Sequence, residues 1–229
     1  MITRTTELDL ANRPYVLFDF DGTLADTKPG IVRTATTVLL GWGIPEDVVS
    51  AHVEELIGPP FPDAFTQVFG LSASDAVEVT ERYRAIYYTL DRSAWPFFPG
   101  VQTALLRLSQ AGRVLAIASS KKGDLVHRCV ADNDATGLFA TIVGQHGNVR
   151  TKSQAIDRAL HNLKVDADHT VMVGDRFHDV EGAASFGIPC IGVLWGNTGT
   201  RKELADAGAT AVVDTVDELI SVLLGIEAQ

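Results

Sequence analysis

The fold is decided by Val16-Leu17-Phe18-Asp19-Phe20-Asp21-Gly22-Thr23-Leu24, an apolar run that ends abruptly in two carboxylates and a glycine. The run Tyr15–Phe20 is typical of a short buried strand. Side chains alternate along a strand, so Asp19 and Asp21 point the same way while the chain stays extended. Such carboxylates are costly to desolvate unless a cation or protons compensate their charge. The segment therefore indicates a metal, an acid/base pair or both; the simpler alternative is an Asx-turn that satisfies loop amides.

A second acidic segment has the same construction. In Val171-Met172-Val173-Gly174-Asp175-Arg176-Phe177-His178-Asp179, another apolar strand ends in a glycine and two acids four positions apart. If the chain turns helical after Gly174, Asp175 and Asp179 lie on one helix face. Two acidic strand ends suit a hard cation such as Mg²⁺, whereas a helix N-cap and a solvated helix residue are the simpler interpretation of this segment alone.

The rest of the chain alternates strands with helices, which predicts a doubly wound, Rossmann-like parallel sheet of the α/β class. Ligands of such sheets bind beyond the carboxyl ends of the strands. The other predicted strands are Val114–Ala118, Thr141–Val143, Thr170–Val173, Ile188–Leu194 and Ala211–Val213. The predicted helices are Val101–Ala111, Gly123–Asp132, Ser153–Asn162, Val180–Phe186, Arg201–Ala207 and Val216–Leu224.

One region departs from this alternation. Between about Lys28 and Trp95 the apolar pattern is helical, with no convincing strand, and Ser72 and Asp75 form a plausible helix-capping box. The economical interpretation is an all-helical domain inserted after the first strand. We therefore predict a core of residues 1–27 and 96–229, and a helical cap of residues 28–95.

Charge and composition indicate which partners and which cellular compartment to expect. The formal net charge is −10 and no basic stripe is visible, which argues against a nucleic-acid partner. The chain contains no run of about 18 apolar residues, so a membrane span is not expected. Cys129 and Cys190 lie far apart in apolar contexts and are predicted to be buried free thiols, as in a reducing cytoplasm.

Together the acidic segments resemble the haloacid dehalogenase superfamily, in the subgroup that includes phosphoglycolate phosphatase. The family's first motif, Asp-x-Asp-x-Thr, is matched by Asp19, Asp21 and Thr23, and its last, Gly-Asp-x-x-x-Asp, by Gly174, Asp175 and Asp179. Ser119 matches the strand-ending hydroxyl of the second motif. Lys152 matches the lysine of the third. The four motifs occur in the family's order over nearly the whole chain.

Three details depart from the family pattern. Ser119-Ser120-Lys121 stands where many relatives carry Thr-Asn-Lys, and Ser153 follows Lys152 where proline is frequent. Arg150 is therefore a competing phosphate-binding cation, although Lys152 keeps the better register. Asn197 stands where relatives often have tyrosine.

The resemblance implies a role for each matched residue. Asp19 is expected to be the nucleophile and Asp21 the general acid/base, with Mg²⁺ held by Asp19, the Asp21 backbone carbonyl, Asp175 and Asp179. Gly22, Thr23, Ser119, Ser120 and Lys152 are expected to bind the phosphoryl group. Within the cap, Thr27, Thr34, Arg82 and Arg84 are candidate substrate contacts, each with an ordinary surface role as the simpler interpretation. His178 is either a supporting group of the acidic loop or a solvated histidine.

The expected activity is Mg²⁺-dependent hydrolysis of a small phosphate monoester, such as phosphoglycolate or a nucleoside monophosphate, through a phospho-aspartyl intermediate. The alternatives are a phosphomutase of the β-phosphoglucomutase type and a non-catalytic binding module on the same fold. The expected partner is a small phosphorylated metabolite, with no nucleic acid and no membrane, in the cytoplasm. The sequence is compatible with a monomer or a homodimer.

Overall fold

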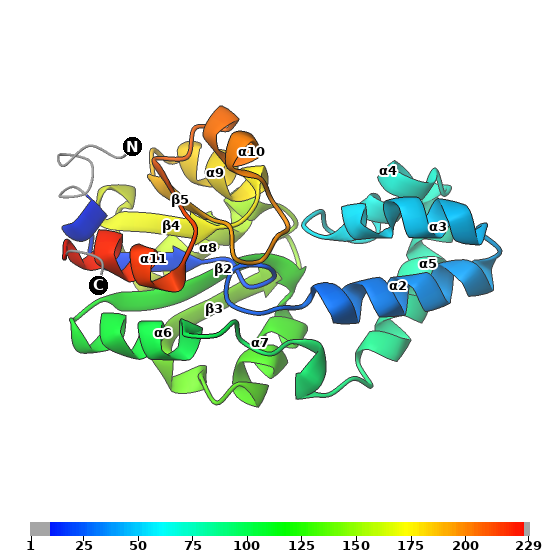
Figure 1. Ribbon diagram of the computed structural model, residues 1–229, viewed down its shortest axis with the longest axis horizontal. Coiled ribbons are helices and arrows are strands. Elements are labelled where there is room, and N and C mark those ends of the chain that lie inside the picture. Colours follow the sequence, from blue (N-terminus) through cyan, green and yellow to red (C-terminus); the bar gives the residue numbers. More distant parts are fainter. Residues whose placement is uncertain (1–9, 227–229) are drawn as a thin grey trace. The chain divides into compact units, whose positions relative to one another are not determined.

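The computed structural model describes residues 10–226 (Figure 1). By backbone contacts the chain divides into two compact units: a core unit, which comprises the chain up to Ala25 and from Phe97 onward, and an inserted unit, Asp26–Pro96. Within the described range, no helix combines the length and the apolar character that crossing a bilayer requires.

The core unit contains a six-stranded parallel sheet in the order β3-β2-β1-β4-β5-β6. Its strands are β1 (Tyr15–Phe18), β2 (Val114–Lys122), β3 (Phe139–Gln145), β4 (Thr170–Gly174), β5 (Cys190–Val193) and β6 (Ala211–Val213). Because β1 pairs with β2 on one side and with β4 on the other, the strand order reverses at the centre of the sheet. A crevice at such a reversal is where open α/β sheets bind ligands.

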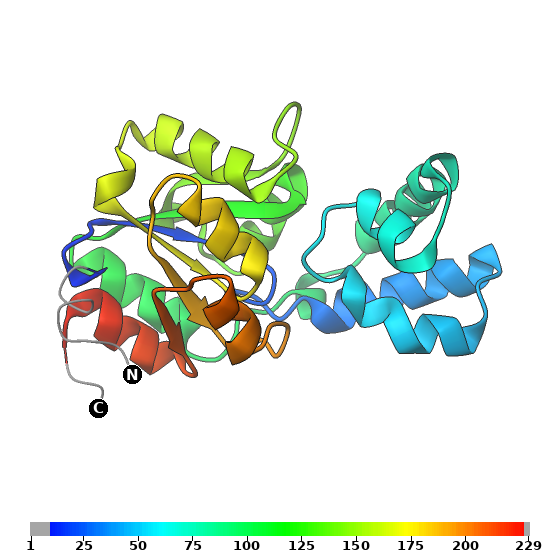
Figure 2. The ribbon, with the colours of Figure 1, turned by 90° about the horizontal axis from the view of Figure 1, so that it is seen from above.

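Helices cover both faces of this sheet, as the view in Figure 2 shows. They are α6 (Val101–Gln110), α7 (Gly123–Asp132), α8 (Lys152–Leu163), α9 (Phe177–Ala184), α10 (Arg201–Asp206) and α11 (Val216–Leu224), with the short 3₁₀ helices η3 (Thr136–Leu138) and η4 (Ala167–His169). Helices α8 and α9 lie on one face, and α6 and α11 on the other (Figure 2). The predicted doubly wound α/β core is confirmed.

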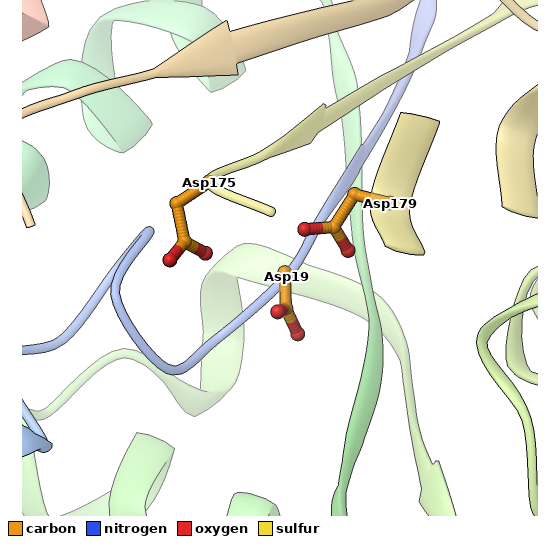
Figure 3. Close-up of side chains that lie close together, drawn as sticks. All are labelled: Asp19, Asp175 and Asp179. Carbon is orange, nitrogen blue, oxygen red and sulfur yellow. The ribbon is translucent and has the colours of Figure 1, made fainter. Parts of the chain in front are cut away.

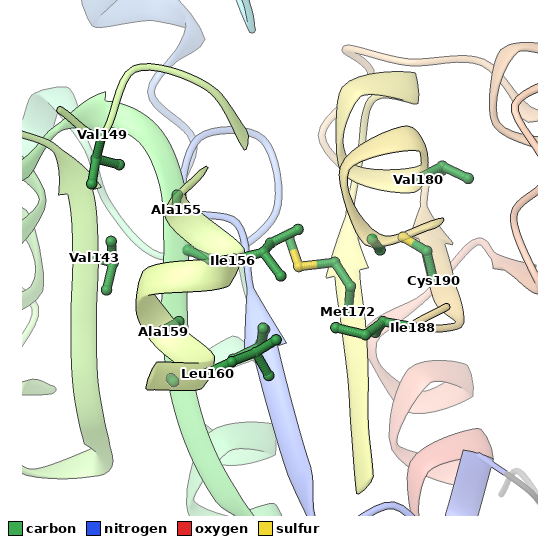
Figure 4. Close-up of a cluster of buried hydrophobic side chains, with 14 of the residues drawn as sticks. Val143, Val149, Ala155, Ile156, Ala159, Leu160, Met172, Val180, Ile188 and Cys190 are labelled. Atoms are coloured by element: carbon green, nitrogen blue, oxygen red, sulfur yellow. The ribbon is translucent and has the colours of Figure 1, made fainter. Parts of the chain in front are cut away.

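One face of the sheet buries a continuous apolar cluster under α8 and α9 (Figure 4). Ile156 and Ala159 on α8 and Met172 on β4 are fully buried. Removing a side chain of the size of isoleucine or methionine from water stabilises the fold by about 1.5–3 kcal/mol. This packing fixes α8 and α9 against the central strands, and the first turns of these helices carry Lys152 and Asp179. Cys190 in this cluster and Cys129 on α7 are buried free thiols, as predicted.

The inserted unit is helical in its regular elements. It contains α2 (Lys28–Trp42), α3 (Glu46–His52), η1 (Val53–Leu56), α4 (Asp63–Phe69), α5 (Ala73–Tyr87) and η2 (Arg92–Ala94). Ser72 caps α5 by accepting a hydrogen bond from the Asp75 backbone N at 3.1 Å, so the predicted capping residue is confirmed. An aromatic group that includes Phe65, Tyr83, Tyr87 and Trp95 fills the interior of this unit.

The two chain segments that connect the units lie side by side. Ala25 and Phe97 form an antiparallel bridge, and the Phe98 backbone N donates to the Leu24 carbonyl at 3.0 Å. On the inserted side, the Asp26 backbone N donates to the Pro96 carbonyl at 2.8 Å. The insertion therefore leaves and re-enters the core through a two-stranded neck.

Candidate active site

Three aspartates from two neighbouring strands and one helix meet at the carboxyl edge of the sheet. Asp19 follows β1, Asp175 follows β4 and Asp179 lies in the first turn of α9. Each offers a carboxylate oxygen within 4.8 Å of those of the other two. Figure 3 shows the three side chains close together, each from a different segment of the chain. The strand-strand pairing explains the meeting, since Phe18 is in register with Val173 and the Asp19 backbone N donates to the Val173 carbonyl at 2.9 Å.

Lys152 joins this cluster from the N-terminus of α8. Its Nζ lies 2.8 Å from Asp19 Oδ1 and 2.8 Å from Asp179 Oδ1, and it donates to the Ala118 carbonyl at 3.0 Å. Burial alone would lower the pKa of Lys152, but the charges of Asp179 and Asp19 outweigh it, and the pKa is raised above its ordinary value. Lys152 is therefore a buried, charged ammonium group.

The cluster carries more negative charge than Lys152 balances. Burial, followed by the charges of Asp179 and Asp19, raises the pKa of Asp175 to about 8. Burial also raises the pKa of Asp179 to about 6, although Lys152 opposes it. When all three carboxyl groups are ionised, one ammonium group leaves two negative charges, which a divalent cation would neutralise. Oxygen donors of this kind fit Mg²⁺, so Asp19, Asp175 and Asp179 could hold that ion.

Hydroxyl groups hold Asp175 in place from two sides. Thr23 Oγ1 donates to Asp175 Oδ1 at 2.9 Å, and Thr198 Oγ1 donates to Asp175 Oδ2. Trp195 in turn donates from Nε1 to the Thr23 carbonyl at 2.9 Å. Thr23 was predicted to bind phosphate; in the structure its hydroxyl orients the Asp175 carboxylate.

Glycines let the segments of the site approach closely. Gly22 has a φ of +76°, and a Cβ there would lie 2.3 Å from Asp175 Oδ2. A Cβ at Gly196 would lie 2.3 Å from the Gly22 carbonyl oxygen, and one at Gly199 would lie 2.0 Å from the Asp175 carbonyl oxygen. The turn after β1, the end of β4 and the loop after β5 thus pack backbone against backbone.

The remaining core predictions divide into buried and exposed groups. Ser119 is buried in β2, with its Oγ accepting a hydrogen bond from the Lys121 backbone N at 3.2 Å, and Ser120 beside it is half-buried. The side chain of Arg150, the competing cation, is exposed. Asn197 is exposed in a left-handed turn, with a φ of +50°. His178 is half-buried on α9 against Phe177, and its pKa is lowered, first by burial and then by Arg176.

Asp21 lies outside the three-carboxylate cluster. Its carboxylate is paired with Lys121, whose Nζ lies 3.0 Å from Oδ1 and 3.3 Å from Oδ2. Sequence reasoning missed Lys121, Thr198 and Trp195 as parts of the site. For Lys121 a signal existed, because it lies two residues beyond Ser119 and alternate residues of a strand share a face.

The four cap candidates lie in the inserted unit in two different settings. Thr27 and Thr34 are buried, and their hydroxyls have no hydrogen-bond partner among the described residues. Arg82 is exposed, pairs with Glu78 at 2.6 Å and places its guanidinium over the Trp42 ring; Arg84 is half-buried.

Comparison with known proteins gives one consistent family. Residues 16–193 match the family described as haloacid dehalogenase-like hydrolase. A 5′-nucleotidase of Pseudomonas aeruginosa is 34% identical over 193 residues, covering 83% of this chain and 86% of that protein. Tyrosine-protein kinase PtkA of Mycobacterium tuberculosis is 35% identical over 211 residues, covering 89% of this chain and 70% of that protein. The crystal structure of a predicted phosphatase from Clostridium acetobutylicum has a TM-score of 0.87 at 31% identity. The match covers 93% of this chain and 99% of that one.

The matched region begins in β1 and ends with β5, so it includes Asp19, Asp21, Ser119, Lys152 and Asp175. The resemblance that the four motifs indicated is confirmed: this chain belongs to the haloacid dehalogenase-like hydrolases.

Proposed function

We propose that this protein is a Mg²⁺-dependent phosphatase that hydrolyses a small phosphate monoester through a phospho-aspartyl intermediate on Asp19. The observation that carries the proposal is the position of the Asp19 carboxylate, beside Asp175, Asp179 and the ammonium group of Lys152 at the carboxyl edge of the sheet. A carboxylate nucleophile divides a difficult hydrolysis into two easier steps.

In the first step an Asp19 carboxylate oxygen forms a bond to phosphorus while the bond from phosphorus to the ester oxygen breaks. Asp21, two residues on, gives a proton to that oxygen, and the alcohol leaves. In the second step Asp21 takes a proton from water as the water oxygen attacks phosphorus. The bond from phosphorus to Asp19 then breaks, which releases inorganic phosphate and restores both aspartates.

Other groups of this chain bind and orient the phosphoryl group. Lys152 neutralises part of the charge around Asp19, and the Ser119 hydroxyl and the backbone amides near Gly22 donate to phosphoryl oxygens. Asp19, the Asp21 carbonyl, Asp175 and Asp179 would hold Mg²⁺. When bound, the ion would supply positive charge that offsets the repulsion between the carboxylate nucleophile and the phosphate dianion.

The relatives bear on the substrate class. We propose phosphoglycolate or a nucleoside monophosphate, which agrees with the 5′-nucleotidase among the relatives. Residues of the inserted unit, with Thr27, Thr34, Arg82 and Arg84 as candidates, would select the leaving group.

The direct test is phosphate release from a panel of phosphoglycolate, nucleoside monophosphates, hexose phosphates and pyrophosphate, with Mg²⁺ and with EDTA. We expect Mg²⁺-dependent release and one substrate with the highest kcat/KM. Asp19→Asn should abolish turnover while the melting curve still shows a folded protein. Retained turnover in Asp19→Asn would exclude the phospho-aspartyl mechanism. Isomerisation of a hexose phosphate without phosphate release would favour the phosphomutase instead.

A further inference from the structure

A buried ion pair joins Asp21 to Lys121, which lies two residues beyond Ser119 on β2. The Nζ of Lys121 contacts both carboxylate oxygens of Asp21, at 3.0 and 3.3 Å. The Lys121 side chain is 7% exposed and that of Asp21 is 17% exposed. Contacts to both oxygens restrict the rotation of the carboxylate group more than a contact to one oxygen would.

The backbones on both sides of this pair are also fixed. Asp21 lies in a tight turn, in which the Leu24 and Ala25 backbone N atoms both donate to the Phe20 carbonyl at 3.0 Å. The Lys121 backbone N donates to Ser119 Oγ, and a Cβ at Gly144 would lie 2.6 Å from the Lys121 carbonyl oxygen. Lys121 therefore projects from a closely packed part of β2, and its side chain has little freedom to follow a moving carboxylate.

Chemistry at Asp21 depends on such control. A general acid must hold its carboxyl oxygen within about 2.6–3.2 Å of the oxygen that receives the proton, directly or through one water. Asp19 and Asp175 are oriented by Lys152 and by the two threonine hydroxyls, respectively. For Asp21 the orienting contact is Lys121.

We propose that Lys121 is a positioning residue that holds the Asp21 carboxylate in the orientation required for proton transfer to the leaving oxygen. This inference rests on the phosphatase function proposed above. In the step concerned, the bond from Asp19 to phosphorus forms and the bond to the ester oxygen breaks. Asp21 enters this step protonated, gives its proton to that oxygen and becomes the carboxylate that pairs with Lys121. Lys121 touches neither the phosphoryl group nor the leaving group in this step.

The proposal makes a prediction that a phosphate-binding or a purely structural lysine would not share. An alkyl phosphate needs a proton on its leaving oxygen, whereas 4-nitrophenyl phosphate releases a stabilised phenolate and needs little help. Positioning of the acid should therefore matter for the alkyl ester and much less for the aryl ester. The quantity to compare is kcat/KM, because it covers the steps up to formation of the phospho-aspartate.

The experiment measures kcat/KM of wild type, Lys121→Met and Asp21→Asn with 4-nitrophenyl phosphate and with the best alkyl phosphate of the substrate panel. We expect Lys121→Met to lower the value for the alkyl ester at least about tenfold more than the value for the aryl ester, within the range that general acid catalysis contributes. In the double variant with Asp21→Asn, the Lys121→Met change should cause no further selective loss. Lys122→Met is the matched control, since the Lys122 side chain is 40% exposed and faces Asp124, and it should behave as wild type.

A melting curve with and without Mg²⁺ shows whether each variant is folded and still responds to the ion. If Lys121→Met is unstable, Lys121→Gln keeps a hydrogen-bond donor at the site and should show a smaller selective loss of the same kind. Equal losses with both esters, or no loss, would overturn the positioning role while leaving the phosphatase intact. Wild-type protein that hydrolyses neither ester would overturn the proposed function and this inference with it.

Discussion

Gly174 lies so close to Asp179 that no side chain fits between them. A Cβ at Gly174 would lie 2.2 Å from Asp179 Cγ and 2.3 Å from its Oδ2. That Oδ2 also accepts a hydrogen bond from the Arg176 backbone N at 3.1 Å, so the carboxylate cannot turn away without losing a partner. The glycine at the end of β4 thus sets the position of the acid in the first turn of α9.

Gly174→Ala should therefore displace Asp179 and lower kcat/KM by about 100-fold, the loss that a misplacement of about 1 Å causes in a catalytic group. The Mg²⁺ concentration for half-maximal activity should rise as well. Gly137→Ala is the control, because a Cβ at Gly137 has nothing within 4 Å. Wild-type kinetics in Gly174→Ala would show that Asp179 has no part in turnover.

Substitutions can show whether Lys152 or Arg150 is the phosphate-binding cation. Lys152→Met leaves Asp19 and Asp179 buried without their ammonium partner, and breaking a buried ion pair in this way costs about 3–5 kcal/mol of unfolding free energy. We expect a lower Tm together with loss of turnover. Arg150→Met removes an exposed side chain and should change the unfolding free energy by less than about 0.5 kcal/mol, with turnover retained. The opposite pattern would make Arg150 the phosphate-binding cation.

The acidic cluster predicts that the stability of the folded chain depends on pH and on bound Mg²⁺. The pKa of Asp175 is raised to about 8, mainly by burial. Between its ordinary pKa near 4 and this value, the folded chain binds more protons than the unfolded chain, so the stabilisation present at low pH is lost as the pH rises. In EDTA, Tm should therefore contain a component that decreases from about pH 5 to pH 8.

Mg²⁺ binds the deprotonated carboxylates, so it should raise Tm more at about pH 8 than at about pH 5. Thermal melts across this range, with EDTA and with Mg²⁺, measure both effects. Asp175→Asn should remove the part of this component that extends to about pH 8, together with most of the Mg²⁺ shift, and leave the part below about pH 6 that Asp179 contributes. An equal Mg²⁺ shift at both pH values would place the ion away from Asp175.

The hydroxyl of Thr198 should support metal binding without touching the ion. Thr198→Val keeps the side-chain volume but removes the donor to Asp175 Oδ2, and loss of a partner of this kind weakens metal affinity by about 10–100-fold. We expect a higher Mg²⁺ requirement with nearly unchanged turnover at saturating Mg²⁺. Thr103→Val, at an exposed position of α6, serves as the control. An unchanged Mg²⁺ requirement would assign the hydroxyl to loop packing alone.

Most of the core sheet could be predicted because apolar runs and turn residues mark its elements locally. Ala211–Val213, Gly123–Asp132 and Val216–Leu224 have the predicted bounds. Helix α9 begins at Phe177 rather than Val180, because Asp179 accepts from the Arg176 backbone N and extends the helix backward into polar sequence. In the inserted unit, α4 was not predicted, since a helix of seven residues between Pro62 and Gly70 gives too short an apolar pattern.

The site was predictable only where a motif carried it. Asp19 and Asp175 follow two paired strands and Asp179 lies in the first turn of the helix after the second strand, so their meeting follows from the fold. Thr198 and Trp195 reach the site through contacts across the sheet edge, 23 and 172 residues from their partners in the chain. No periodicity or spacing encodes such contacts, and only the folded backbone reveals them.

The neck between Ala25 and Phe97 has a consequence for engineering. The two chain ends that the insertion occupies are hydrogen-bonded neighbours in the core, so a short turn can join them without stretching either strand. A module exchanged at this point has to match one pair of adjacent ends and nothing else in the chain path. The core sheet can thus accept other inserted units through two adjacent crossings, after Ala25 and before Phe97.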